Sequence, residues 1–103
     1  MTLEELSALQ RRLEEVVRQG WQARDPEVQV SSVLRDGNKI DMTVVSKQFA
    51  GLEWREREAA FWPVFDSVPK YDLLYMTCCL LLTPEEAASP GPANGKDNTD
   101  DWA

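Results

Sequence analysis

A run of ten residues, Leu73–Leu82, constrains the fold more than any other feature of this 103-residue sequence. The run reads LLYMTCCLLL and contains no charged residue. It is far shorter than a membrane-spanning helix, and apolar periodicity alone does not separate a buried strand from a buried helix. Its length and its flanking residues favour a strand. We therefore predict an inner β-strand over residues 73–82.

The sequence before this run predicts one helix and one β-hairpin. Apolar residues recur at steps of three and four over residues 3–19, which is typical of an amphipathic helix that ends near Gly20. Apolar and polar residues then alternate over residues 28–34 and 40–44. The turn between them, Asp36–Lys39, contains Asp-Gly, which is a strong hairpin signal. We expect an antiparallel pair of strands after the first helix.

A second helical segment leads from the hairpin to the apolar run. Residues 52–61 predict a helix, and Pro63 predicts a break near Trp62, followed by a short helical piece through about residue 68. The spacing of Thr83 and Glu86 is that of a capping box, so a final helix begins there. The charges on the second helix are interpreted as a solvated face; they are Glu53, Arg55, Glu56, Arg57 and Glu58.

These elements predict a small α+β domain over residues 1–88 with the order α-β-β-α-α-β-α. A helical crossover permits the last strand to pair in parallel with the hairpin, so we expect a three-stranded mixed sheet with helices packed mainly on one face. The other face is expected to be covered by the short end helix or by Trp21, in the connection after the first helix; an open interaction surface is the alternative. Residues 89–103 are rich in Pro, Gly, Asn and Asp and predict a disordered acidic tail.

Composition argues against several classes of chemistry. The chain has no histidine, which excludes histidine metal sites and Ser-His-Asp or Cys-His catalysis, and its net charge is −7. The two cysteines, Cys78 and Cys79, are adjacent and are expected on opposite faces of a strand, as buried, reduced thiols. No signal peptide is recognised at the start. We expect a cytoplasmic protein that is not an enzyme and has no metal or cofactor.

Three stretches together resemble the BolA-like family. They are LQRRLEEVV (residues 9–17), VVSKQFAGLEWREREAAFWPVF (residues 44–65) and LLYMTCCLLLTPEEA (residues 73–87). The resemblance implies a variant of the type II KH fold. It also implies the family's roles, which are partnership with monothiol glutaredoxins in [2Fe–2S] cluster binding and, in bacteria, regulation of morphology and the stress response.

The sequence departs from this family at both cluster ligands. The family has a histidine in the last strand, and the matching position here is Tyr75. A second ligand, His or Cys, lies in the loop between the first two strands, where the turn Asp36–Lys39 contains neither. The resemblance therefore implies a regulatory or adaptor protein without conventional histidine-based cluster ligation; a glutaredoxin-linked role is a further alternative.

The favoured hypothesis is that this chain, as a monomer or weak dimer, binds a protein partner. The candidate contact residues are Trp54, Arg55, Arg57, Trp62 and Tyr75. Trp54 lies among charges and is the best candidate for an exposed anchor, whereas Trp62 and Tyr75 are expected mainly in the core. The alternative is a KH-like nucleic-acid-binding module, such as a transcription regulator. A KH loop carries G-x-x-G, whereas residues 51–54 read GLEW, and the acidic charge opposes phosphate.

Overall fold

The computed structural model describes residues 1–88 as one α+β domain built on a three-stranded mixed sheet. The predicted fold class is therefore confirmed. In chain order the elements are α1 (Leu3–Trp21), β1 (Gln29–Arg35), β2 (Lys39–Val45), η1 (Lys47–Phe49), α2 (Trp54–Phe61), η2 (Trp62–Phe65), α3 (Lys70–Leu73), β3 (Met76–Leu82) and α4 (Pro84–Ala88). The expectation of a disordered tail concerns residues 89–103, which lie outside the described residues.

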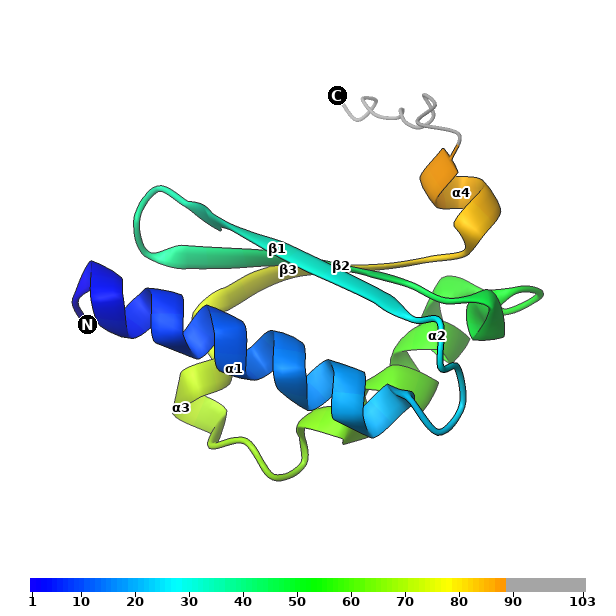
Figure 1. Cartoon of the computed structure of the whole chain (residues 1–103), viewed down its shortest axis with the longest axis horizontal. Helices are drawn as coiled ribbons and strands as arrows, with labels where there is room; N and C mark the ends of the chain where they lie inside the picture. The colour runs from blue at the N-terminus through cyan, green and yellow to red at the C-terminus, as the bar shows by residue number, and fades with distance from the viewer. Residues whose placement is uncertain (89–103) are drawn as a thin grey trace.

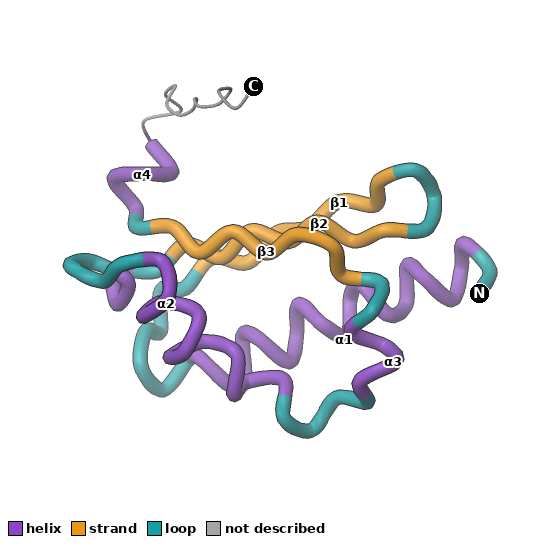
Figure 2. Tube along the Cα trace, turned by 180° about the vertical axis from the view of Figure 1, so that it is seen from behind, coloured by secondary structure: helices purple, strands orange, loops and turns teal. Residues whose placement is uncertain are grey.

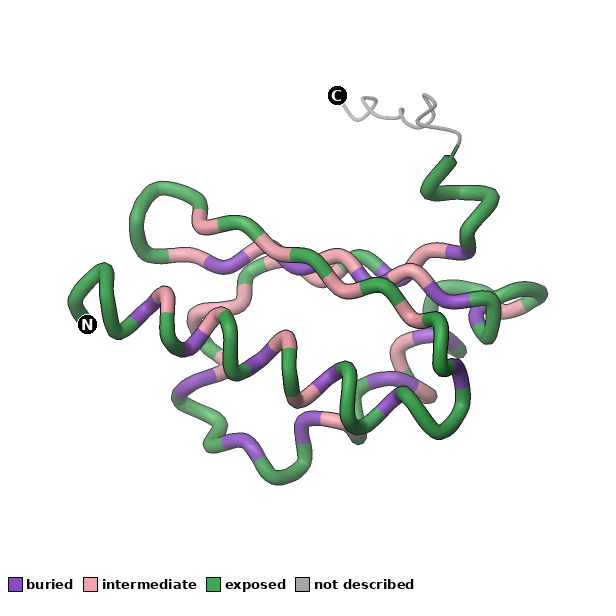
Figure 3. Tube along the Cα trace, viewed as in Figure 1, coloured by how far each residue is buried: buried purple, intermediate pink, exposed green. Residues whose placement is uncertain are grey.

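The sheet has the order β1-β2-β3, with β1 antiparallel and β3 parallel to the central strand β2. Helices α1, α2 and α3 lie on one face of this sheet, and α4 projects at one end of the other face (Figure 1). Viewed from behind, α2 lies on the same side of the sheet as α1 and α3 (Figure 2). The hydrophobic core therefore lies between one sheet face and three helices, as the burial colours show (Figure 3).

Helix α1 supplies the longest apolar stripe of the core. Thr2 and Glu5 form the predicted capping box, and every buried residue of the helix is apolar. The helix does not end near residue 19 but continues to Trp21. Gly20 lies inside it, and a Cβ at this position would come within 3.1 Å of the Val64 Cβ. Close packing against η2, and not helix termination, explains this glycine.

Trp21 belongs to the core and not to the opposite sheet face, so the expectation for this residue was wrong. Its ring lies 5.3 Å from that of Phe49 and 5.8 Å from that of Phe61, measured between centroids. Its indole N–H donates a hydrogen bond of 2.9 Å to Ser46 Oγ. This aromatic cluster fastens the end of α1 to the segment that leaves β2.

The hairpin forms with the predicted Asp-Gly turn, and its strands pair from Gln29 with Val45 to Arg35 with Lys39. Asp36 and Gly37 both have positive φ, 58° and 73°, which Gly adopts without steric cost and Asp tolerates. In β2 the residues facing the helices are buried and alternate with partly exposed ones. The alternation in the sequence therefore corresponds to one covered face and one open face.

The apolar run forms a strand that is parallel to β2, as expected, but its limits and its place differ from the prediction. The strand begins at Met76, because residues 70–73 form the short helix α3 after Pro69. It is an edge strand and not an inner one, since β2 occupies the centre. Within residues 1–88, no helix combines the length and the apolar character needed to cross a bilayer.

Candidate functional site

Two exposed tryptophans mark the outer side of the α2–η2 segment. Trp54 begins α2 and is 44% exposed, and Trp62 follows its last residue and is 38% exposed. The exposure expected for Trp54 is confirmed, whereas the core position expected for Trp62 was wrong. The Trp62 ring does contact the core at its edge, since its centroid lies 5.3 Å from that of Phe65. Each indole thus presents part of its apolar surface to solvent.

Arg57, on the same helix, points into the domain instead of toward solvent. It is only 9% exposed, and its guanidinium donates to the carbonyl oxygens of Leu52 at 3.0 Å and Leu81 at 2.8 Å. It also binds both carboxylate oxygens of Glu86, at 2.6 and 3.1 Å. The expectation of a solvated face was therefore wrong for Arg57, because it fastens α2, β3 and α4 together. Four of its five guanidinium N–H groups are thus used inside the domain, which makes Arg57 a poor contact for a partner.

The other two candidate residues lie in different surroundings. Arg55 is exposed and forms no ion pair with any residue in the described part of the chain. Tyr75 is half-buried and packs against the core just before β3, so the core contact expected for it is confirmed. Its carbonyl accepts a hydrogen bond of 2.8 Å from Ile40 N–H. The structure therefore joins Trp54, Arg55 and Trp62 on one helical segment and leaves Tyr75 at the sheet.

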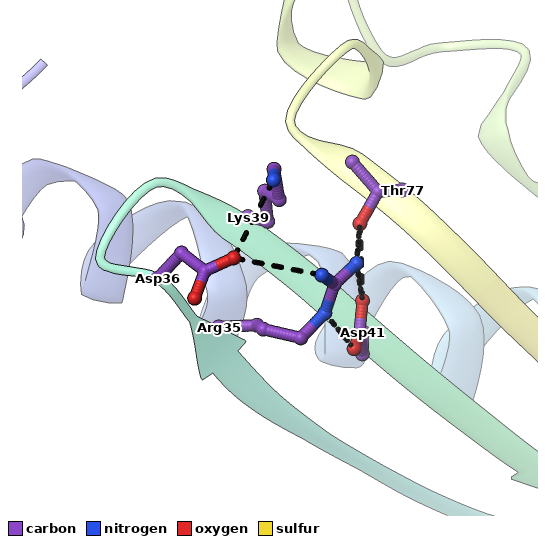
Figure 4. Close-up of polar contacts among 5 residues, drawn as sticks. All are labelled: Arg35, Asp36, Lys39, Asp41 and Thr77. Carbon is purple, nitrogen blue, oxygen red and sulfur yellow. Dashed lines mark hydrogen bonds and ion pairs between the residues drawn. The ribbon is translucent and has the colours of Figure 1, made fainter.

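The sheet face opposite the helices carries a polar cluster near the hairpin turn (Figure 4). Arg35 Nε donates to Asp41 at 2.7 Å, and Arg35 Nη2 donates to Thr77 Oγ1 at 3.1 Å. Thr77 Oγ1 in turn donates to Asp41 at 3.0 Å. The hydrogen bond from Arg35 lowers the pKa of Asp41 and raises that of Arg35. These groups satisfy one another across three strands, which favours a structural role.

The rest of this sheet face is open over the described residues. Val33 and Leu80 are exposed on it, and α4 stands only over one end (Figure 1). The expectation that the chain covers this face itself was therefore wrong for residues 1–88. A hollow of about 670 Å³ lies beside α4, lined by the ends of β1 and β2 and by Pro84, Ala87 and Ala88.

The two cysteines lie on opposite faces of β3, as predicted for neighbours in a strand. Cys79 packs against the core, and burial raises the pKa of its thiol to about 12. Cys78 pairs with Asp41 in the register of the open face, and burial raises its pKa as well. Both thiols are therefore poor nucleophiles and poor metal ligands near neutral pH. Within residues 1–88, no group of three or more His, Cys, Asp or Glu side chains is placed to hold a metal ion.

A buried polar network that the sequence did not reveal lies at the start of β1. The Asp25 carboxylate accepts hydrogen bonds from Ser46 Oγ at 2.7 Å and from the backbone N–H groups of Glu27 and Lys47 at 3.0 and 3.3 Å. The Ser46 hydroxyl also accepts from Trp21. Asp25 and Ser46 are 21 residues apart, and no local pattern links them. All of their hydrogen bonds are internal, so this network reads as structural support.

Comparisons with known proteins add no relative. No family model, no curated protein and no solved structure matches this chain. The assignment of a function therefore rests on the surface of the domain itself.

Proposed function

We propose that this chain is a small BolA-like regulatory or adaptor protein that binds a protein partner through the α2–η2 segment. In this proposal Trp54 and Trp62 are the anchors and Arg55 is a polar contact. The binding needs no histidine and no [2Fe–2S] cluster. The resemblance of residues 9–17, 44–65 and 73–87 to the BolA-like family supports the regulatory part of the proposal.

The exposure of two indoles on one short segment carries the proposal. Trp is among the residues most enriched at binding hot spots, because it buries a large area and loses little conformational entropy. Here the buried side of the segment, formed by Arg57, Phe61 and Phe65, fixes the backbone that presents the indoles. An anchor held on a packed helix is preorganised for binding.

The other two candidate functions lack a comparable observation. The loop that would contact a nucleic-acid backbone has a positive φ only at Gly51, 80°, and is followed by Glu53. For a glutaredoxin-linked cluster, the family's ligand position is the half-buried Tyr75, and the two cysteines lie on opposite faces of β3. Both functions enter the test below as contrary outcomes.

The test compares Trp54→Ala and Trp62→Ala with Tyr71→Ala, which removes a more exposed aromatic, 69% exposed, from α3. Affinity capture from the source cells with the full chain as bait identifies the bound protein, and its affinity for each variant is then measured. Each tryptophan variant is expected to weaken binding about tenfold or more, while Tyr71→Ala stays within about twofold. Trp54→Ala and Tyr71→Ala should leave the melting temperature unchanged, whereas Trp62→Ala should lower it without unfolding the chain, because its ring contacts Phe65.

Four outcomes would contradict the proposal. One is a tryptophan variant that unfolds, since that residue would then be part of the core. Another is equal loss of binding in Tyr71→Ala. The third is binding of single-stranded RNA or DNA, seen as a salt-sensitive mobility shift. The fourth is a brown product when the chain is co-expressed with a monothiol glutaredoxin.

A further inference from the structure

The tryptophans of the α2–η2 segment alternate with carboxylates at a regular spacing. Trp54, Glu58, Trp62 and Asp66 follow one another at intervals of four residues. In an α-helix this spacing places neighbours on one side, so Trp54, Glu58 and Trp62 form a ridge about 12 Å long. Asp66 follows the 3-10 helix η2, whose three residues per turn rotate it away from this line, so it lies beyond Trp62 and not in line with it. We call the three residues together with Asp66 the tryptophan ridge.

The carboxylates of this ridge have no cation of their own. Neither Glu58 nor Asp66 forms an ion pair or a side-chain hydrogen bond with any residue from 1 to 88. Arg57 precedes Glu58 in the sequence but is already neutralised by Glu86, and Arg55, three residues before Glu58, forms no ion pair with it. Glu58 itself is half-buried. The ridge is therefore negative and unpaired, apart from Arg55 at its start.

The indole faces of the ridge also lack a stacked cation, whereas another tryptophan of this chain, Trp21, has one. The Arg24 guanidinium carbon lies 4.8 Å from the centroid of the Trp21 ring. Over residues 1–88, no basic side chain stacks on Trp54 or Trp62 in this way. Guanidinium groups are attracted to the indole face and also form paired hydrogen bonds with carboxylates. Alternating indoles and carboxylates thus suit a row of arginines.

From this charge complementarity we propose that the tryptophan ridge binds a basic segment of the partner protein, with arginines about two helical turns apart, as the two indoles are. Each guanidinium lies against an indole face and donates hydrogen bonds to a neighbouring carboxylate, which is its counter-ion. This inference rests on the proposed function, because it specifies the partner of the same surface. A second copy of this chain does not fit the description, since its net charge of −7 repels another copy.

The test uses a synthetic probe peptide, acetyl-(Leu-Ala-Ala-Arg)4-amide, and the full chain labelled with ¹⁵N. The peptide contains no tryptophan, so the four indole N–H signals of the chain report where it binds. We expect the Trp54 and Trp62 signals to shift on titration, while the Trp21 signal, buried and bonded to Ser46, stays in place. The affinity of the peptide should fall as the salt concentration is raised. The same peptide with Glu in place of Arg should bind at least about tenfold more weakly.

Matched variants separate the ridge from the overall charge of the protein. Glu58→Gln with Asp66→Asn removes the two ridge carboxylates and should weaken binding about fivefold. Glu4→Gln with Glu27→Gln makes the same change in net charge at exposed positions elsewhere and should stay within about twofold. Equal weakening by both pairs, or equal binding of the Glu peptide, overturns the inference in favour of non-specific attraction.

The two proposals fail in distinguishable ways. If the arginine peptide does not shift Trp54 and Trp62 but Trp54→Ala still loses the captured partner, the basic-segment inference is overturned and the adaptor function stands. If neither the peptide nor a captured partner depends on the ridge, both are overturned. Shifts confined to the hollow beside α4 also overturn the inference, because they place the binding surface elsewhere.

Discussion

Asp25 shows at the scale of one residue how a small domain keeps a buried charge. Its side chain is 2% exposed, yet burial does not dominate its ionisation. The hydrogen bond from the Ser46 hydroxyl, with those from the Glu27 and Lys47 backbone, holds the pKa of Asp25 below its ordinary value. The ionised form is thus the one that the folded state stabilises, and it fastens the start of β1 to the end of β2.

This lowered pKa gives a prediction for stability in acid. The ordinary pKa of Asp, about 3.9, is that of the unfolded chain, and the folded value lies lower. The contribution of Asp25 is therefore complete above that ordinary pKa and disappears as the pH falls through the folded value. We expect Asp25→Asn to lower the free energy of unfolding by about 1–3 kcal/mol at pH 7, because an ionic acceptor of three hydrogen bonds is lost.

Urea unfolding of the parent and Asp25→Asn between pH 7 and pH 2 checks this prediction. The gap between the two stabilities should narrow below about pH 4. Asp66→Asn is the control, since that exposed carboxylate makes no hydrogen bond within residues 1–88, and it should change stability little at either pH. A gap that stays constant down to pH 2 would show that the charge of Asp25 is not the stabilising feature.

Strand β3 shows at the scale of an element how one register divides neighbouring residues between core and solvent. Leu80 is 42% exposed and pairs with Thr43, whereas Leu81 is 1% exposed and pairs with Val44. The two residues are of the same type, and only the face of the strand on which each side chain lies differs. A slip of one residue would exchange their surroundings.

Alanine substitutions at this pair test the register directly. Leu81→Ala should lower the free energy of unfolding by about 2–5 kcal/mol, because it opens a cavity between β3 and the helices. Leu80→Ala should cost less than about 1 kcal/mol, since the side chain lies on the open face. Denaturant unfolding measures both. Similar costs for the two variants would contradict the position of β3, and with it the claim that one sheet face is open.

The sequence predicted the elements whose signals are local and missed what depends on distant partners. The capping boxes at Thr2 and Thr83 and the Asp-Gly turn are set by neighbours three residues apart or fewer, and the structure has all of them. Helix α3 and the edge position of β3 were missed, because an apolar run does not show which side of it is covered.

The candidate surface divides in the same way. The exposure of Trp54 was predicted from the charges around it, and the structure confirms it. The exposure of Trp62 and the burial of Arg57 were not foreseen, since both depend on contacts from other elements. The four-residue spacing of Trp54, Glu58, Trp62 and Asp66 was readable in the sequence. The charge of this ridge could not be inferred from the spacing, because it depends on the ion pair between Arg57 and Glu86, which leaves the ridge negative.

At the scale of the whole molecule, both edges of the sheet carry an arginine from a helix. Arg18 on α1 donates to the Val30 carbonyl of β1 at 3.3 Å, and Arg57 on α2 donates to the Leu81 carbonyl of β3 at 2.8 Å. Each bond occupies a carbonyl that would otherwise be available to a strand from another chain. Exposed edges are the usual route to sheet-to-sheet association, and arginines placed there oppose it.

We therefore expect the full chain to be a monomer of 11.7 kDa by light scattering at about 100 µM, at both low and high salt. The range of salt matters, because net charge and capped edges both oppose association but only the charge is screened. A monomer at low salt that dimerises at about 0.5 M salt would show that repulsion alone keeps the chains apart. Arg18→Ala frees the Val30 carbonyl and removes one positive charge, which makes the net charge more negative. The mass of this variant by light scattering should therefore rise at high salt, where repulsion is screened, and stay that of a monomer at low salt. A parent chain that is already dimeric at low salt would contradict the role of both edges.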